Sequence, residues 1–179
     1  LVVGNIVLEI QRKTLEKPEI YFGLETEVRI SEQIPIGEST GVDVPGQLWK
    51  RYHMEKASIE ANLNTTVEMG MSHTEGTSQN LFTYFAGGLV QNIPDRLQDG
   101  FVKRELSAGE YIVCRVEAEN FEDLVTVALD QASKYLFGIW LPRHNLTTEP
   151  FSAEKYYRDV EGMACMEIWV KPLPLKNKS

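Results

Sequence analysis

The sequence has few of the residues that define several classes of protein. Only two of its 179 residues are cysteines, which is too few for a disulfide-stabilised scaffold. Only three residues are histidines. No run of eighteen apolar residues is present, so we expect no transmembrane helix. The 18 Lys and Arg residues are outnumbered by 26 Asp and Glu, for a formal net charge of −8. Because binding to phosphates needs clustered basic residues, this balance argues against direct contact with nucleic acid.

Other chemistry-bearing patterns are also missing. The histidines show no metal-ligand spacing, and no glycine-rich loop carries the Lys and Ser/Thr partners of a phosphate site, so we predict neither metal nor cofactor. The apolar start of the chain lacks a basic leader and a small-residue cleavage site, which is unlike a signal peptide. Cys114 and Cys165 lie in apolar, strand-like runs, and we expect buried free thiols in a reducing cytoplasm.

What is present is the composition of a globular domain. Hydrophobic residues make up 42% and charged residues 25% of the chain. We expect an N-terminal arm at 1–18, one domain at 19–175 and a polar tail at 176–179. Within the domain, the pattern suggests two halves, at about 19–97 and 98–175.

Hydrophobic periodicity predicts the order of strands and helices. Residues 1–17 are predicted to form an arm or a short helix, and Pro/Gly-rich residues 32–43 a loop. Helices are expected at 44–60, with Asp43 as N-cap, and at 120–141, where Asn120 is a good N-cap and Pro142 the end. Strands are expected at 19–30, 67–73, 81–91, 100–106, 110–117, 150–158 and 162–171, with a turn at 75–80.

Short turns between the predicted strands favour antiparallel pairing. Each half offers one long helix and several such strands, which predicts an α+β fold with both helices on one face of a curved sheet. In the last strand, Met166, Ile168 and Val170 share one side, which suits a core packed against helices. The other side combines a carboxylate, Glu167, with the indole of Trp169, which is unusual for a solvent-facing surface.

Aromatic residues near acidic ones form the candidate site. Glu154 and Tyr156 share one side of their strand, and Phe82 and Tyr84 lie together on another. Rings around one carboxylate suit an amphipathic organic cation, because the rings give cation–π attraction and the carboxylate supplies the opposite charge. The simpler alternative is that the aromatics are core residues and the glutamates belong to a solvated face.

Six segments together resemble a known family. In order, they are LWKRY (48–52), FTYFAGG (82–88), GFVKRELSAGEYIVCRV (100–116), IWLP (139–142), AEKYY (153–157) and MEIWVKPL (166–173). The ordered set, over about 19–173, closely resembles the GyrI-like effector-binding domain of AraC-type bacterial transcription activators. The resemblance implies two strand–helix–strand–strand repeats related by a pseudo-twofold axis, with a ligand cleft between them. We place this cleft on the face of the sheet opposite the helices.

The resemblance also implies site residues. In multidrug-binding members, a cleft glutamate in an aromatic-Glu-x-Tyr motif pairs with hydrophobic cations. The match here runs from Ala153 to Tyr156, with Ala in place of the aromatic, which makes Glu154 the first choice and Glu167 the second. Tyr84 matches the tyrosine of a Tyr-x-x-Gly strand, and Trp169 faces the cleft by its parity. Phe82 and Tyr156 complete the predicted ligand-binding set.

Three functions are compatible with the resemblance. The first is binding of hydrophobic cations by a stand-alone, monomeric or homodimeric domain. The DNA-binding module of the regulators has no counterpart in the eighteen residues before the domain, so DNA would be reached only through a protein partner. The second is hydrolysis of reactive electrophilic small molecules by the same glutamate, helped by Tyr84 or Tyr156. The third is binding of a protein, as in relatives that bind DNA gyrase.

Overall fold

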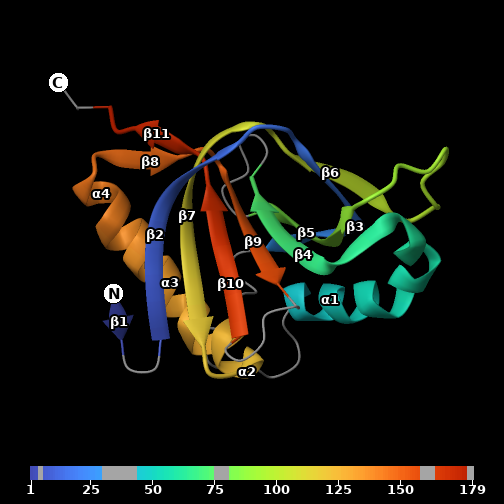
Figure 1. Cartoon of the computed structure of the whole chain (residues 1–179), viewed down its shortest axis with the longest axis horizontal. Coiled ribbons are helices and arrows are strands. Elements are labelled where there is room, and N and C mark those ends of the chain that lie inside the picture. Colours follow the sequence, from blue (N-terminus) through green and yellow to red (C-terminus); the bar gives the residue numbers. More distant parts are fainter. Residues whose placement is uncertain (4–5, 30–43, 75–80, 158–163, 177–179) are drawn as a thin grey trace.

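The computed structural model describes residues 1–3, 6–29, 44–74, 81–157 and 164–176. They form a strongly curved antiparallel sheet with helices on one face (Figure 1). The sheet order is β1-β2-β7-β10-β9-β4-β5-β3-β6. Its strands are β1 (Val2–Val3), β2 (Ile6–Leu15), β3 (Glu19–Arg29), β4 (Leu63–His73), β5 (Leu81–Val90), β6 (Val102–Leu106), β7 (Gly109–Ala118), β9 (Phe151–Tyr157) and β10 (Ala164–Val170). A separate pair joins β8 (Leu146–Thr148) to β11 (Pro172–Pro174).

Two long helical segments cover the sheet, as predicted. The first is α1 (Val44–Glu55), followed by 3-10 turns at Lys56–Ser58 and Glu60–Asn62. The second runs over 121–143 and contains α2 (Phe121–Asp123), α3 (Leu129–Tyr135) and α4 (Leu141–Arg143), with π-helical turns at Leu124–Ala128 and Leu136–Trp140. Asn120 caps its start, since the Asn120 side chain accepts a hydrogen bond from the Asp123 backbone N–H at 2.8 Å.

The strand pairing shows the two repeats. Each repeat consists of two strands, a helical segment and two further strands: β2-β3-α1-β4-β5 in the first, and β6-β7-helix-β9-β10 in the second. The first strand of each repeat pairs with the other repeat, because β2 lies beside β7 and β6 lies beside β3. The two halves meet where β4 pairs with β9, with Gly70 opposite Glu154. The α+β fold, with an antiparallel curved sheet and two long helical segments, is therefore confirmed, and each repeat has one strand more before its helix than the resemblance implied.

The structure differs from the sequence-based expectation at the N-terminus. Residues 1–17 are neither an arm nor a short helix, because β2 pairs with β7 over nine residue pairs, from Val7 opposite Glu117 to Leu15 opposite Gly109. The alternating Ile6 and Leu8 are buried against the second helical segment. Isolated alternation was too short to distinguish a strand from an arm, and the partner strand lies about a hundred residues away.

Smaller differences occur at the ends of elements. The α-helical part of the first helix ends at Glu55, although its 3-10 continuation keeps Ile59 buried. The second helix continues through Pro142 to Arg143, and Asn145 follows with a φ of 55°, a left-handed conformation that ends helices. The predicted loop at 32–43, with Asp43 as N-cap, and the predicted turn at 75–80 lie outside the described residues.

The sheet separates three clusters of buried side chains. Two lie on the face that carries the helices, which we call the helix face: one under residues 121–143, with Met166, Ile168 and Val170 as predicted, and one under α1. The third lies on the opposite, concave face and contains Tyr21, Tyr111 and Trp169 among its members. The curved sheet thus has apolar side chains on both faces. On the helix face, the central strands β9 and β4 lie between the two helical segments.

Candidate functional site

The strand register assigns each predicted site residue to a face. Glu154 pairs with Gly70, and Ser72 pairs with both Tyr84 and Ser152. Residues that pair directly in a sheet point to the same side. Tyr84 packs with α1, so this side is the helix face.

Four of the six predicted residues therefore lie on the helix face, namely Glu154, Tyr156, Tyr84 and Phe82. Glu167 and Trp169 lie on the concave face. The cleft was expected on the face opposite the helices, whereas Glu154, the first-choice glutamate, lies on the helix face. Parity separates the two sides of a strand, but it cannot show which side the helices cover.

Trp49 of α1 joins the predicted aromatic residues into one cluster. Its indole Nε1 donates a hydrogen bond to the Tyr84 hydroxyl at 2.9 Å. Its ring meets the Tyr156 ring edge-on, with centroids 5.8 Å apart, and Phe121 of α2 lies 6.2 Å from Tyr156 on the other side. The cluster therefore crosses β9 from one helical segment to the other. We call Trp49, Tyr84, Phe121 and Tyr156, together with Glu154, the aromatic site.

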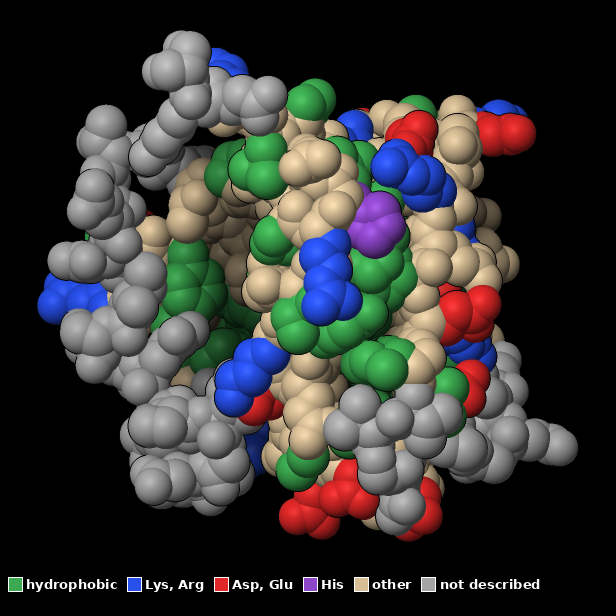
Figure 2. All heavy atoms as spheres, turned by 90° about the vertical axis from the view of Figure 1, so that its left-hand side faces the viewer, with side chains coloured by type: hydrophobic (Ala, Val, Ile, Leu, Met, Phe, Trp, Pro, Cys, Tyr) green, Lys and Arg blue, Asp and Glu red, His purple; other side chains and the backbone are tan. Residues whose placement is uncertain are grey.

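Hydrophobic side chains also reach the surface of the molecule. The face of the molecule in Figure 2 is hollowed on one side, and hydrophobic side chains line the inside of this hollow. Phe121 is 60% exposed, so the rim of the aromatic site reaches the surface. Exposed aromatic area of this kind is available for a hydrophobic ligand.

Glu154 is the acidic group of the aromatic site. The Tyr156 hydroxyl donates a hydrogen bond to Glu154 Oε2 at 2.8 Å. Burial, followed by the nearby Glu154 carboxylate, raises the pKa of Tyr156 well above its ordinary value, so the phenol stays protonated and keeps donating. The Glu154 side chain is half-buried. The result is a carboxyl group held beside aromatic rings.

Gly70 explains how Tyr84 reaches Trp49. A Cβ at position 70 would lie 2.3 Å from the Tyr84 hydroxyl oxygen and 3.5 Å from Trp49 Cζ2. A residue with a side chain would therefore displace the tyrosine from the indole. Gly70, which stands opposite Glu154, therefore adds no side chain to the helix face between the two helical segments.

Sequence reasoning missed a second acidic group on this face. Glu68 is 4% exposed and lies opposite Tyr156 in the β4–β9 pair. Its Oε2 lies 2.9 Å from His53 Nε2 of α1. The alternation in β4 placed Glu68 on one side with Gly70 and Ser72, which was the available signal. His53 follows Trp49 by one helical turn, and that spacing also predicts a shared helix side.

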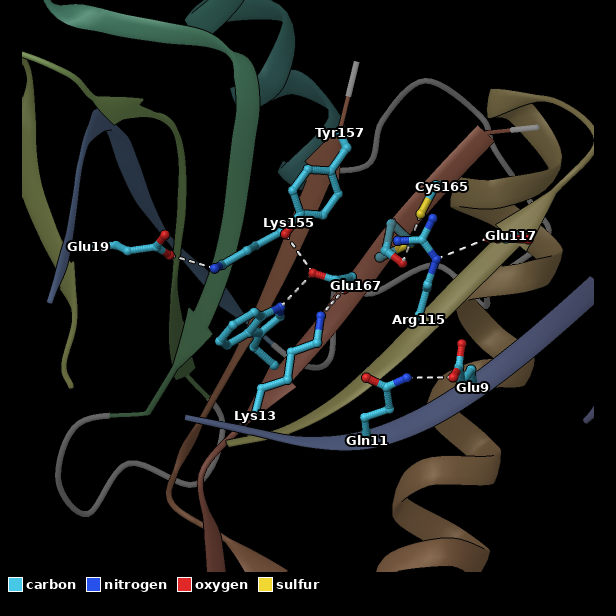
Figure 3. A network of polar contacts seen from close by, with 12 residues as sticks. Glu9, Gln11, Lys13, Glu19, Arg115, Glu117, Lys155, Tyr157, Cys165 and Glu167 are labelled. Carbon is cyan, nitrogen blue, oxygen red and sulfur yellow. Dashed lines mark hydrogen bonds and ion pairs between the residues drawn. The ribbon is translucent and has the colours of Figure 1, made fainter. Parts of the chain in front are cut away.

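On the concave face, Lys155 lies in a polar network (Figure 3). Lys155 is 3% exposed, and its Nζ donates to Glu19 Oε1 at 2.5 Å and lies 3.5 Å from the centroid of the Trp169 ring. Burial lowers the pKa of Lys155, against the opposing effect of Glu19. Trp169 is thus already in contact with a cation of the chain itself, whereas the sequence analysis assigned it to a ligand.

The Glu167 carboxylate is held in the same network by three donors. Its Oε1 accepts from the Tyr157 hydroxyl at 2.6 Å and from Trp169 Nε1 at 3.2 Å, and its Oε2 accepts from Lys13 Nζ at 2.9 Å (Figure 3). Burial would raise the pKa of Glu167, but the hydrogen bonds from Tyr157 and Lys13 outweigh it and lower the pKa. Glu167 is therefore a structural counter-charge within the fold.

This arrangement predicts a pH-dependent contribution of Glu167 to stability. Because its pKa is lower in the folded chain than in the unfolded one, its stabilisation is present above the ordinary glutamate pKa of about 4.3 and is lost as the pH falls through the folded value. At neutral pH we expect Glu167→Gln to cost about 1.5 kcal/mol, since Lys13 keeps partial solvation. Thermal unfolding should show this gap closing towards pH ~3. A gap that stays constant with pH would contradict the assignment.

The described residues give no support for a metal site, a reactive thiol or a membrane-spanning helix. Within these parts of the chain, no three His, Cys, Asp or Glu side chains gather in a way that could hold a metal ion. Burial raises the pKa of Cys114 to about 12, so this thiol stays protonated at neutral pH. None of the helices in the described ranges is both long enough and apolar enough to cross a membrane.

Comparison with known protein families decides the family. The sequence model of the GyrI-like small molecule binding domain matches residues 13–172. This chain belongs to the GyrI-like family. The match begins near the end of β2, continues through β10 and includes every residue of the aromatic site, and it confirms the resemblance carried by the six sequence segments. A search of the curated proteins finds no match to the sequence.

Solved structures share the GyrI-like fold at low sequence identity. An integron cassette protein from the mobile metagenome of Vibrio cholerae has a TM-score of 0.68 and 13% identity, covering 94% of this chain and 99% of that one. SAV2435, bound to tetraphenylphosphonium, has a TM-score of 0.64 and 16% identity, covering 95% and 97%. EcmrR in a complex with DNA has a TM-score of 0.54 and 11% identity, covering 96% of this chain but only 59% of that longer chain.

Proposed function

We propose that this GyrI-like domain binds hydrophobic organic cations in the aromatic site, with Glu154 as the counter-charge. The observation that carries the proposal is the Glu154 carboxylate, which accepts a hydrogen bond from Tyr156 while the Tyr156 ring contacts Trp49 and Phe121. One fixed negative charge and several aromatic rings thereby share one face, between the two helical segments.

This combination suits a large, poorly hydrated cation. The faces of Trp49, Tyr156 and Phe121 can give cation–π attraction, and the rings also give dispersion contacts, which depend little on the exact shape of the ligand. The carboxylate adds a preference for positive charge, which grows as water is displaced from the site. A cation of this chemical class occupies SAV2435, a structure with the same fold, in the form of tetraphenylphosphonium.

The surroundings of Glu167 favour Glu154 as the ligand carboxylate. Glu167 already pairs with Lys13 and accepts from Tyr157 and Trp169, and it is 3% exposed. A ligand at Glu167 would have to replace these donors, and the loss of a buried pair costs more than a new one returns. Glu154 is less buried than Glu167, and it lies beside the rings of the aromatic site, where the Tyr156 hydroxyl donates a hydrogen bond to it.

The test compares a cation with a neutral molecule of similar shape. Isothermal titration calorimetry with the unmodified protein should show saturable binding of tetraphenylphosphonium. Triphenylphosphine oxide, which presents similar aryl groups without net charge, should bind at least about tenfold more weakly, because it lacks the charge that Glu154 would pair with. Equal affinity for the two compounds, or no binding of tetraphenylphosphonium, would contradict the proposal.

A further inference from the structure

An ion pair crosses the concave face of the sheet and links the two repeats. Lys155 of β9 donates from its Nζ to Glu19 Oε1 of β3 at 2.5 Å, and Figure 3 shows the two side chains pointing towards each other. Each partner has a further contact: the Tyr21 hydroxyl donates to Glu19 Oε1 at 3.0 Å, and Lys155 Nζ lies over the Trp169 ring. Because Lys155 is 3% exposed, salt and solvent screen this pair little.

The two partners of this ion pair are far apart in the sheet. β4 and β5 lie between β9 and β3, so three strand spacings of about 4.8 Å give about 14 Å across a flat sheet. The register runs from Lys155 through Met69 and Gly87 to Gly23. Glu19 therefore lies four residues beyond the position in line with Lys155, which adds about 13 Å along the strand. Because side chains stand roughly perpendicular to a sheet, the two meet only through the strong curvature seen in Figure 1.

Two glycines lie on the inside of this curve. Gly23 and Gly87 pair with each other, and by strand parity both positions belong to the concave face. A Cβ at position 23 would lie 2.1 Å from the Ala86 carbonyl oxygen, and one at position 87 would lie 2.4 Å from that of Phe22. Glycine inside a strand often marks a tight bend. Two of the three positions in line with Lys155 thus carry no side chain that would resist bending.

The aromatic site lies on the outside of the same curve. α1 packs on β3 and β5, where its Leu48 is buried with Phe22 of β3. Tyr156 follows Lys155 on β9 and points to the other face of that strand. Its ring contacts Trp49 of α1, with centroids 5.8 Å apart. A change in the curvature between β9 and β3 would therefore change the spacing between α1 and β9 on the helix face.

We propose that Lys155 and Glu19 are positioning residues for the aromatic site, because their ion pair holds the sheet curved and keeps α1 at the spacing from β9 that a bulky cation needs. This inference rests on the proposed function, since it assumes that the aromatic site binds cations. It adds a determinant of ligand size on the face that the ligand does not touch. Without the ion pair the sheet relaxes towards a flatter form, and groups on its outer side move closer together.

The distance between the two helical segments tests the curvature without any ligand. Nitroxide labels are attached to Met54→Cys in α1 and Val127→Cys in the second helical segment, where the native side chains are 82% and 49% exposed. Cys114 and Cys165 are buried, so they take up little label. Pulsed electron paramagnetic resonance should show a mean label distance about 2 Å shorter in Lys155→Met than in the labelled parent.

Three further variants separate the ion pair from a general loss of charge. Glu19→Gln keeps an oxygen that can accept from Lys155 but loses the charge, so about half of the shift is expected, and it serves as the test if Lys155→Met does not fold. Adding Glu19→Gln to Lys155→Met should shift the distance no further, because both changes remove one contact. Lys134→Met is the matched control: it breaks the pair with Asp130 within α3 and should leave the distance unchanged.

Two cations of different size test the consequence for binding. Calorimetry compares tetraphenylphosphonium with the much smaller benzyltrimethylammonium, in the unmodified protein and in Lys155→Met. The ratio of the two affinities should fall about tenfold in the variant, because only the bulky cation needs the full spacing. A general loss of folded protein would weaken the apparent binding of both cations alike and would leave the ratio unchanged.

The outcomes separate this inference from the proposed function. An unchanged label distance in Lys155→Met overturns the role of the ion pair in curvature. An unchanged affinity ratio, with tetraphenylphosphonium still bound, overturns its role in ligand size and leaves the proposed function intact. If the unmodified protein does not bind tetraphenylphosphonium, the proposed function fails, and the inference fails with it.

Discussion

Replacing Glu154 by Gln is expected to weaken the binding of tetraphenylphosphonium by about 30-fold, or about 2 kcal/mol. The amide keeps an oxygen that can accept the hydrogen bond from the Tyr156 hydroxyl, so the aromatic contacts around Trp49 should persist. Only the negative charge is removed. Calorimetric titration of the variant and the unmodified protein at the same ionic strength measures the difference, which should shrink at high salt.

Glu167→Gln is the matched control for this experiment. It makes the same chemical change on the neighbouring strand, where Glu167 faces the concave side and binds Lys13, Tyr157 and Trp169. We expect this variant to be less stable but to bind tetraphenylphosphonium within about twofold of the unmodified protein. If Glu167→Gln abolishes binding while Glu154→Gln does not, the ligand carboxylate belongs to the concave face.

Gly23→Ala is expected to cause the largest loss of stability, about 3 kcal/mol or more in the free energy of unfolding. Gly23 of β3 pairs with Gly87 of β5, and a Cβ at position 23 would lie 2.1 Å from the Ala86 carbonyl oxygen and 2.6 Å from Gly87 Cα. Both are backbone atoms, so no side chain can rotate away. β3 is also held by β6 on its other edge, with Gly23 opposite Val102. Urea unfolding followed by circular dichroism measures the loss.

Gly138→Ala is the control for the loss of glycine itself. Gly138 lies in the helical segment 121–143, and a Cβ there would meet nothing within 4 Å. Because glycine is a poor helix former, alanine should stabilise the protein by about 0.5–1 kcal/mol. The same substitution is therefore expected to act in opposite directions at the two positions. A small loss at Gly23 would mean that β3 and β5 can separate without cost.

The pairing of the repeats explains why the aromatic site lies where it does. β4 and β9 are the central strands, and each belongs to a different repeat. Trp49 and Tyr84 come from the first repeat, whereas Phe121, Glu154 and Tyr156 come from the second. Neither repeat alone assembles the aromatic site. Ligand binding at this junction would therefore depend on the relative position of the two repeats.

Several features of the site could be read from the sequence. The alternation Met166, Ile168, Val170 against Glu167 and Trp169 is found in the structure as predicted, with the first set under the helix and the second on the other face. Such predictions succeed because side chains alternate strictly along a strand. They describe one strand at a time.

Other features could not be read from any local pattern. The pairing of β2 with β7 joins segments about a hundred residues apart, and Lys13, which the sequence placed in an arm, becomes a partner of Glu167 through it. Trp49 reaches Tyr156 of β9, and His53 reaches Glu68 of β4, only because α1 packs on β3 and β5 beside these strands. Helical spacing alone gives a helix side, and it does not identify the strands beneath that side.

Short turns, periodicity and ordered motifs are properties of neighbouring residues, so the α+β class of the fold and the family could be predicted without the structure. The sequence also supplied two glutamates as candidates for one role. Their surroundings differ in the folded chain through long-range partners: Glu167 is enclosed by Lys13, Tyr157 and Trp169, whereas Glu154 lies among aromatic rings between the two helical segments. A carboxylate's role depends on what surrounds its charge, and the folded chain sets those surroundings.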